Sequence, residues 1–187
     1  IALLYAVSGL AAAALGVASI LFYVFVYTLW AKPRSASSTL VGAVAGAVAP
    51  LIAAVALDGR IGLPGLTLFA IIFLWQPPHV WAITLYRRDD YRAAGFPMPP
   101  DVIGEAATRR RMLHYTLLLV PVTLAPFALG LLGGIYAVGA VVFCGAFVHS
   151  AVQVLREASD EAARRMFRVS LVFLFGIFVS MLADLLL

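Results

Sequence analysis

The sequence has little charge and almost no cysteine. Of its 187 residues, 12% are charged, nine are acidic, and Cys144 is the one cysteine. One cysteine excludes an internal disulfide framework and a cluster of thiolate metal ligands, so we interpret Cys144 as a small packing residue. The scarcity of charge also excludes an ordinary soluble domain, in which about a quarter of the residues are charged.

The start of the chain lacks an initiator methionine and the basic, small-residue pattern of a secretory signal peptide. We therefore expect further residues to precede Ile1 in the natural protein. The formal net charge of +4 would be compatible with nucleic-acid binding. However, the basic residues are sorted by loop, which is typical of membrane topology instead.

Apolar residues are abundant: 64% of the chain is hydrophobic and the mean hydropathy is +1.03. A helix needs about 20 apolar residues to cross a bilayer, and lipid-exposed backbone must satisfy its own hydrogen bonds. We therefore predict an all-α, polytopic transmembrane helix bundle, a single domain over residues 1–187. Residues 1–7 are interpreted as the end of an earlier helix, with the next beginning near Ser8 and Gly9. The six predicted spans are 8–30, 38–57, 61–86, 108–129, 134–155 and 167–187.

The loops between these spans alternate in charge. Twelve of the thirteen lysines and arginines fall on one face of the membrane, and Arg60 is the exception. The positive-inside rule makes that face cytoplasmic. We expect an integral protein of a bacterial cytoplasmic membrane, with Asp184 in a structural role near the opposite interface.

The third span contains a Pro-Pro-His sequence within "FLWQPPHVWAITLYRRDDYRAAGFPMPP", residues 73–100. Pro77 and Pro78 remove two backbone donors and disfavour helical geometry before them, so we expect the helix to kink or restart there. In a membrane such a break requires protein or water to satisfy the freed carbonyls. Gln76 and His79 favour a cavity at this point, and a kink that serves packing alone is the alternative.

Two adjacent aspartates follow this span. If the helix resumes at His79 and continues to Asp90, then His79, Ile83, Tyr86 and Asp90 share one face, with Asp90 about 16 Å further along. Asp89 would point about 100° away, so both carboxylates could bind one metal only if the last turn frays. Asp90 is therefore the stronger candidate.

The segment 87–107 is too long for a simple connection between bundle helices, and its aromatic residues and prolines predict an ordered cap on the cytoplasmic side. Its carboxylates lie among Arg87, Arg88 and Arg92. They form either a solvated ion-pair cluster or a site for Mg²⁺ and a phosphorylated ligand. The arginines at 109–111 are typical of a lipid-headgroup anchor, and His114 and His149 are interpreted as structural.

These residues, together with "YTLWAKPRSASSTLVGAVAGAVAPLI" and "ATRRRMLHYTLLLVPVTLAPFALG", resemble the protoheme IX farnesyltransferase (heme O synthase) branch of the UbiA-type intramembrane prenyltransferases. The resemblance covers essentially the whole chain, and W-x-P-P-H followed by Y-x-x-x-D-Y-x-x-A-G-F-P-M carries it. It implies about nine membrane helices and two Asp-rich cytoplasmic motifs. The second motif matches Tyr86, Asp90 and Tyr91, but the first, of N-x-x-x-D-x-x-x-D type, is absent. We expect that motif to lie upstream of Ile1. This chain has six predicted spans plus a stub, and we expect it to be inactive alone.

The resemblance implies transfer of a farnesyl group from farnesyl diphosphate to a vinyl group of protoheme IX (heme B), with hydration. The product, heme O, would serve terminal oxidases, whose assembly proteins are potential partners; lipid is expected around the bundle and nucleic acid is not. Asp90 and Asp89 would bind Mg²⁺, Tyr86 would join them as a catalytic residue, and His79 would ligate heme iron or bond the carbonyls freed at the prolines. The diphosphate would be held by Lys32, Arg34, Arg87, Arg88 and Arg92.

Two alternative functions follow from the same residues. A UbiA-type prenyltransferase could act on an aromatic quinone precursor, because spacing does not identify the acceptor. A non-enzymatic heme-binding or transport protein would also use a broken helix with a buried histidine. A coupled transporter should show paired broken helices in inverted repeats, and we expect only one here.

Overall fold

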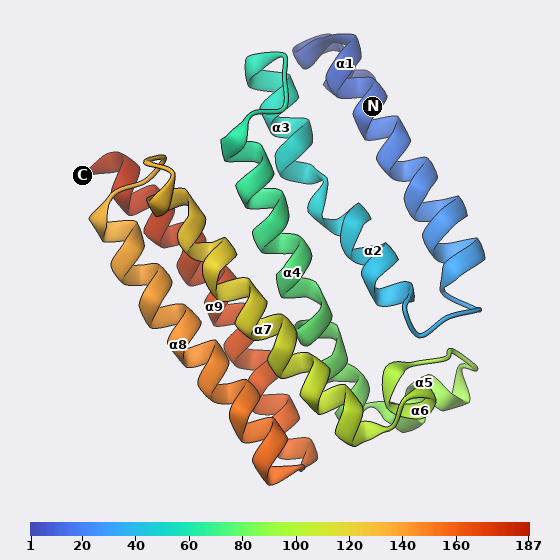
Figure 1. Cartoon of the computed structure of the whole chain (residues 1–187). Coiled ribbons are helices and arrows are strands. Elements are labelled where there is room, and N and C mark those ends of the chain that lie inside the picture. Colours follow the sequence, from blue (N-terminus) through green and yellow to red (C-terminus); the bar gives the residue numbers. More distant parts are fainter.

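The computed structural model of the chain describes residues 1–187 and contains helices, turns and loops but no strands (Figure 1). Six helical spans are long and apolar enough to cross a membrane, which confirms the expected all-α transmembrane bundle. The first span joins α1 to the π-helix η1, and the second joins α2 to α3. The helices are α1 (Ala2–Leu21), η1 (Phe22–Ala31), α2 (Ser38–Ala47), α3 (Ala49–Asp58), α4 (Leu63–Tyr86), α5 (Arg88–Ala93), α6 (Pro99–Val102), α7 (Glu105–Ala128), α8 (Gly134–Glu157) and α9 (Asp160–Leu186).

The six spans run in alternating directions, so their connections gather at two ends of the bundle (Figure 1). The loop after η1, the short helices α5 and α6, and the turn from α8 to α9 lie together at one end. That end carries twelve of the thirteen basic residues, as the loop pattern predicts. We call it the basic end.

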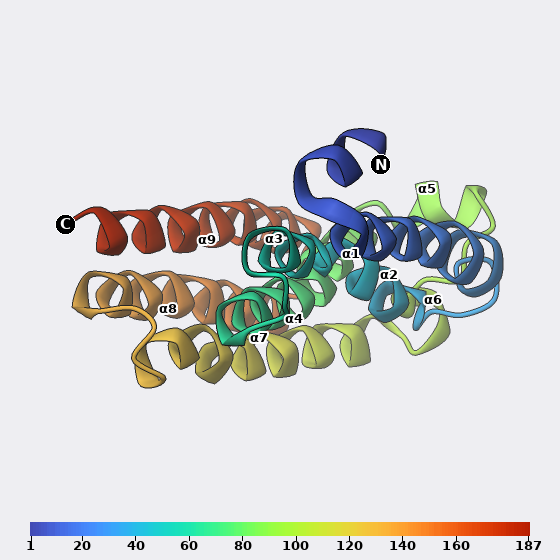
Figure 2. The same ribbon diagram turned by 90° about the horizontal axis from the view of Figure 1, so that it is seen from above.

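The first span changes direction at Gly9, near the predicted helix start. Gly9 has φ 79° and ψ −177°, a conformation that favours glycine because it has no Cβ. The preceding residues form a short helical segment that bends away from the rest of α1 (Figure 2). Beyond α1, the helix widens into η1, and the N–H of Lys32 donates to the carbonyl of Tyr27 at 2.8 Å.

Of the two expectations for α4, a restart at the prolines is wrong, because the helix continues from Leu63 to Tyr86 through Pro77 and Pro78. Proline's fixed φ is itself helical, and two adjacent prolines remove only two backbone donors. Neighbouring side chains hold this turn from both sides. The Trp75 indole donates to the carbonyl of Ser170 at 2.8 Å, and the Gln76 amide donates to that of Ala43 at 3.2 Å.

The last helix begins earlier than predicted, at Asp160 and not near residue 167. Its first turns are polar and therefore contribute nothing to an apolar span. They are helical because Ser159 caps them, its hydroxyl accepting from the N–H of Ala162. At the other end, Asp184 accepts hydrogen bonds from the N–H groups of Gly133 and Tyr136 at the start of α8, consistent with the structural role we expected.

The apolar core lies among α4, α7, α8 and α9, which supply all 19 residues of its main cluster, Cys144 included. Its largest fully buried side chains are Tyr136, Phe147 and Phe173. Helix α4 lies in the middle of the molecule, packed against α7 and α9 on one side and against α2 and α3 on the other (Figure 2). The buried hydrophobic side chains of the first two spans are all alanines: Ala12, Ala13, Ala31, Ala43 and Ala47.

Candidate functional site

The segment after α4 forms a cap at the basic end. Helix α4 ends at Tyr86 because Arg87 leaves helical geometry, with φ −115° and ψ 20°. The expected continuous helix from His79 to Asp90 is therefore wrong. At this point the Arg88 guanidinium donates to the Leu85 carbonyl at 2.7 Å, and so occupies an acceptor that a continuing helix would use.

Asp90 lies at a hollow on this cap, which we call the Asp90 hollow. Its carboxylate accepts from Arg87 at 2.8 Å, and that hydrogen bond raises the pKa of Arg87. Lys32 reaches the same place from the loop after η1, with its ammonium group 4.5 Å from the centre of the Phe96 ring. The volume is about 310 Å³, and the lining residues are Lys32, Ile83, Arg87, Asp90, Tyr91, Ala94 and Phe96.

A larger cavity of about 490 Å³ adjoins the Asp90 hollow and shares Lys32 and Tyr91 with it. We call it the α2–α4 cavity, since α1, η1, α2 and α4 enclose it. Hydroxyl and amide groups alternate with small and apolar side chains along its wall. The remaining lining residues are Ser19, Ile20, Tyr23, Tyr27, Ser38, Thr39, Gly42, Ala45, Gly46, Gln76, Val80 and Met98.

Two glycines of α2 allow this cavity to form. A Cβ on Gly42 would lie 2.8 Å from the Tyr27 ring, and one on Gly46 would lie 2.6 Å from the Gln76 amide. Both distances are well below van der Waals contact. The small residues therefore serve close packing and also leave room for the side chains that line the cavity.

Tyr91 links the two spaces, and sequence reasoning did not include it among the site residues. Burial raises the pKa of Tyr91, so its phenol remains a neutral hydrogen-bond donor at physiological pH. Its position next to Asp90 in the Y-x-x-x-D-Y pattern was the available signal. Gln76, which we expected together with His79 to indicate a cavity beside the prolines, lines the larger cavity, whereas His79 does not.

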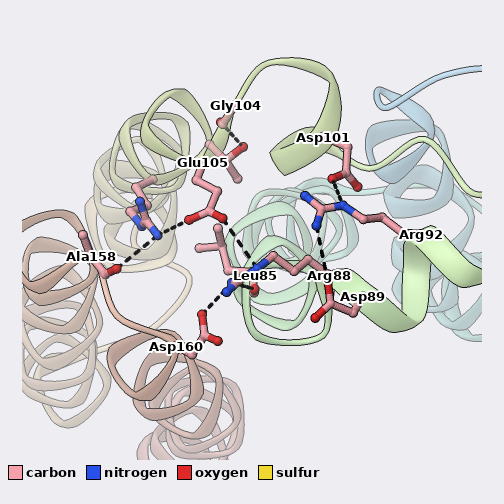
Figure 3. Close-up of polar contacts among 11 residues, drawn as sticks. Leu85, Arg88, Asp89, Arg92, Asp101, Gly104, Glu105, Ala158 and Asp160 are labelled. Atoms are coloured by element: carbon pink, nitrogen blue, oxygen red, sulfur yellow. Dashed lines mark hydrogen bonds and ion pairs between the residues drawn. The ribbon is translucent and has the colours of Figure 1, made fainter.

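Asp89 points away from Asp90, as expected for adjacent residues on a helix. Its side chain is 87% exposed and pairs with Arg92 at 3.3 Å. Arg92 also bonds Asp101 at 2.5 Å, which joins α5 to α6 (Figure 3). The structure therefore does not bring Asp89 or Arg92 to the Asp90 hollow.

Arg88 joins the cap to the C-terminal helices (Figure 3). It bonds Asp160 at the start of α9 at 2.7 Å, and this hydrogen bond raises its pKa. Glu105 of α7 lies 3.6 Å from Arg88 and also accepts from the buried Arg109 at 2.6 Å. Arg109 in turn donates to the carbonyl of Ala158. Arg88 is thus part of an ion-pair network among three elements.

Arg34 lies outside the Asp90 hollow. Its guanidinium donates to the carbonyls of Leu29 and Trp30, both at 3.0 Å, in the last turn of η1. These carbonyls have no partner within the helix, so Arg34 caps its C-terminus. Of the five basic residues predicted to bind diphosphate, only Lys32 and Arg87 meet at Asp90.

His79 and Tyr86 face α9. The His79 ring lies between Trp75 and Phe167, at centroid distances of 4.3 Å and 4.9 Å. Its Nδ1 is 2.7 Å from the Ser170 hydroxyl, which already donates its proton to the Phe167 carbonyl. His79 therefore donates through Nδ1, which leaves the lone pair on Nε2. It does not bond carbonyls freed by the prolines.

Tyr86 packs edge-on against Phe167, with ring centroids 6.3 Å apart. The Arg164 guanidinium lies 5.1 Å from the centre of its ring. Tyr86 does not line the Asp90 hollow. Of the residues that the resemblance groups as catalytic, Asp90 lines this hollow and Tyr86 packs toward α9 instead.

The chain by itself does not enclose a metal ion with its own side chains, since no three histidine, cysteine or acidic residues gather as ligands. Mg²⁺ in phosphate-processing sites usually takes one or two carboxylates, with waters and substrate phosphates completing the shell. Asp90, at the edge of a hollow beside Lys32 and Arg87, fits that kind of shared coordination.

Comparison with known proteins identifies the family. The model of the UbiA prenyltransferase family matches residues 1–179. Protoheme IX farnesyltransferases of Azoarcus sp. (strain BH72), Methylobacterium radiotolerans and Acidiphilium cryptum are 45%, 44% and 42% identical to the chain. The alignments cover 91%, 95% and 97% of this chain but only 57%, 57% and 60% of those relatives.

The fold comparison agrees with the sequence comparison. A solved structure from work on digeranylgeranylglyceryl phosphate synthase in membranes superposes with a TM-score of 0.82 at 16% identity. The match covers 95% of this chain and 62% of that one, and it supports the helical arrangement alone. Because the family model spans nearly the whole sequence, the chain belongs to the UbiA prenyltransferase family.

Proposed function

We propose that the protein transfers a farnesyl group from farnesyl diphosphate to a vinyl group of protoheme IX, with hydration, to give heme O. The relatives named above support this choice of substrates over an aromatic quinone precursor. The observation that carries it is the meeting of Asp90, Lys32 and Arg87 at a hollow that adjoins the α2–α4 cavity.

The Asp90 hollow would take the diphosphate end of the donor. The ammonium of Lys32 and the guanidinium of Arg87 would bond phosphate oxygens and stabilise the negative charge that grows as the allylic C–O bond breaks. Bound Mg²⁺ would supply further charge neutralisation, with Asp90 as its ligand from this chain. The neutral phenol of Tyr91 would donate a hydrogen bond where the hollow meets the larger cavity.

The α2–α4 cavity would take the farnesyl chain. Its apolar lining, including Ile20, Val80 and Met98, suits an isoprenoid and limits the water that could quench an allylic cation. Gln76 is tied to Ala43, so its polar end is fixed in the wall. Arg88 and Arg92 would position the cap through their ion pairs, and Asp89 would assist only indirectly.

Protoheme would approach the α4–α9 face, where His79 keeps the Nε2 lone pair that could ligate iron. The transporter alternative loses support here. It rested on a broken helix, and α4 is continuous. The basic end of this integral membrane protein would face the cytoplasm, and the membrane would be the bacterial cytoplasmic membrane.

The proposal is tested with the protein that the natural gene encodes, purified in detergent and supplied with farnesyl diphosphate, Mg²⁺ and protoheme. Mass spectrometry should detect a heme carrying a hydroxyethylfarnesyl group. Asp90→Asn should reduce turnover by about 100-fold, since it removes the carboxylate that would hold the Mg²⁺ that neutralises the leaving diphosphate.

Asp89→Asn is the matched control, because it removes the same charge from a side chain that points away from the hollow. Its effect should be much smaller. Absence of the product, or equal turnover in Asp90→Asn and the wild type, would disprove the proposal.

A further inference from the structure

A second cavity of about 480 Å³ lies between the start of α2, the cap and the first turns of α7. We call it the α2–α7 cavity. It shares no lining residue with the Asp90 hollow or the α2–α4 cavity. Its basic or histidine lining residues are Arg34, Arg111 and His114, and the lining contains no aspartate or glutamate.

The charge in the α2–α7 cavity is not neutralised within the protein. Arg111 makes neither an ion pair nor a side-chain hydrogen bond, although five other arginines pair with carboxylates. Arg34 bonds only backbone carbonyls through one nitrogen, which leaves its other donors available. Helix α2 begins beside them at Ser38 without a side-chain cap, and its N-terminus adds positive potential.

One face of α7 runs from this cavity toward the membrane interior. Arg111, His114, Tyr115 and Leu118 follow spacings of 3, 1 and 3 residues and so lie on the same side of the helix. The first three line the cavity, and Leu118 is 55% exposed where the span is apolar. A ligand with an anionic head and an apolar tail matches this face, which has basic residues at the cavity and an exposed leucine further toward the membrane interior.

The base of the cavity is aromatic. Trp81 of α4 packs edge-on against Tyr115, with ring centroids 5.2 Å apart. The indole N–H of Trp81 is buried and has no hydrogen-bond partner in the protein. Tryptophan and tyrosine are enriched at the depth of lipid headgroups, where one end of the ring is apolar and the other polar.

We propose that the α2–α7 cavity binds the phosphate of an anionic phospholipid from the leaflet at the basic end. Arg111 and Arg34 bond the phosphate oxygens, His114 contributes a further donor, and an acyl chain lies along Leu118. The shared chemistry is a phosphate ester, which a soluble phosphate also presents. The apolar face below Arg111 favours the lipid.

The test uses the protein that the natural gene encodes, with phosphatidylglycerol or phosphatidylcholine added in detergent and retention of lipid measured by native mass spectrometry. Arg111→Gln should weaken phosphatidylglycerol binding by roughly fivefold, since a basic residue at the membrane surface contributes about that factor. His114→Gln should weaken it less. Arg110→Gln is the matched control, because Arg110 is exposed at the same depth but does not line the cavity.

Thermal unfolding should be unchanged in Arg111→Gln, as the side chain has no partner to lose. Equal losses in Arg110→Gln and Arg111→Gln would show a diffuse surface charge and overturn the site. Equal retention of phosphatidylcholine would do the same. Arg111-dependent binding of inorganic phosphate or diphosphate, without retained lipid, would overturn the lipid in favour of a soluble ligand.

Discussion

The two sides of α4 are built differently. Toward α7, α8 and α9 the structure buries large side chains completely, such as Tyr136, Phe147 and Phe173. Toward α1, η1 and α2 it buries alanines and leaves the α2–α4 cavity. Membrane helices gain stability mainly from close packing, so the C-terminal side is the stable support and the N-terminal side is the adaptable one.

Single residues of α4 and the cap connect these two sides. Trp75 bonds α9 and its neighbour Gln76 bonds α2, at successive positions of one helix. In the cap, Arg88 is anchored to α9 through Asp160, and Phe96 contacts Lys32 from the loop before α2. The Asp90 hollow is therefore positioned by contacts with α9, on the closely packed side of α4, and it adjoins the α2–α4 cavity on the opposite side.

The largest expected effect comes from the packed side. Phe173→Ala should lower the free energy of unfolding by about 3–5 kcal/mol, because it removes a fully buried ring that packs 5.2 Å from Phe147. Phe175→Ala on the same helix is the control. That side chain is 72% exposed, so its loss should change the unfolding free energy little. Equal losses would contradict the contrast between the two sides.

Matched glycine substitutions compare the two sides directly. A Cβ on Gly176 would lie 2.2 Å from the Phe143 ring, so Gly176→Ala should destabilise the protein by about 1–3 kcal/mol in thermal or denaturant unfolding. Gly46→Ala meets the flexible end of Gln76 beside a cavity and should cost less.

Under the proposed function, Gly46→Ala should instead raise the KM for farnesyl diphosphate, because the displaced amide enters the α2–α4 cavity. Gly176→Ala should leave the KM of its folded fraction unchanged. Loss of stability in Gly46→Ala as large as in Gly176→Ala would show that α2 is packed as rigidly as α9.

The smallest expected effect concerns the link between cap and α9. A double-mutant cycle on Arg88→Gln and Asp160→Asn should give a coupling energy of at most about 1 kcal/mol, because solvent screens a pair this exposed. The single variants should also increase proteolysis within residues 87–104. Zero coupling in unfolding measurements, with unchanged proteolysis, would mean that packing alone positions the cap.

Several features of the fold were predictable because they depend on local composition. All six spans were located from apolar length, and the helix start expected near Ser8 and Gly9 coincides with the non-helical Gly9. The start of α9 was missed because its first turns are polar. A restart at Pro77 and Pro78 was expected because backbone rules describe an isolated helix, whereas bonds to Ser170 and Ala43 hold this one.

The candidate site was predictable only in part. The motif identified Asp90 and the basic residues around it, but charge alone could not separate Lys32 and Arg87 from Arg34, Arg88 and Arg92. Arg34 bonds carbonyls of the preceding helix, Arg92 bonds Asp89 and Asp101 within the cap, and Arg88 bonds the distant Asp160, and charge along the chain does not distinguish these roles from diphosphate binding. Tyr91 was matched to the motif but given no role in the site, because its place between two cavities depends on helices far apart in sequence.

The sequence by itself determined the membrane solvent, the six spans, the sorting of charge to one end and the family, because each follows from residue types along the chain. Only the tertiary structure decided which arginines bond carboxylates or carbonyls within the protein, where α4 ends, and where cavities remain. Those outcomes depend on contacts between side chains of different helices. Such contacts are set by how the helices pack, and a local sequence pattern does not specify that packing.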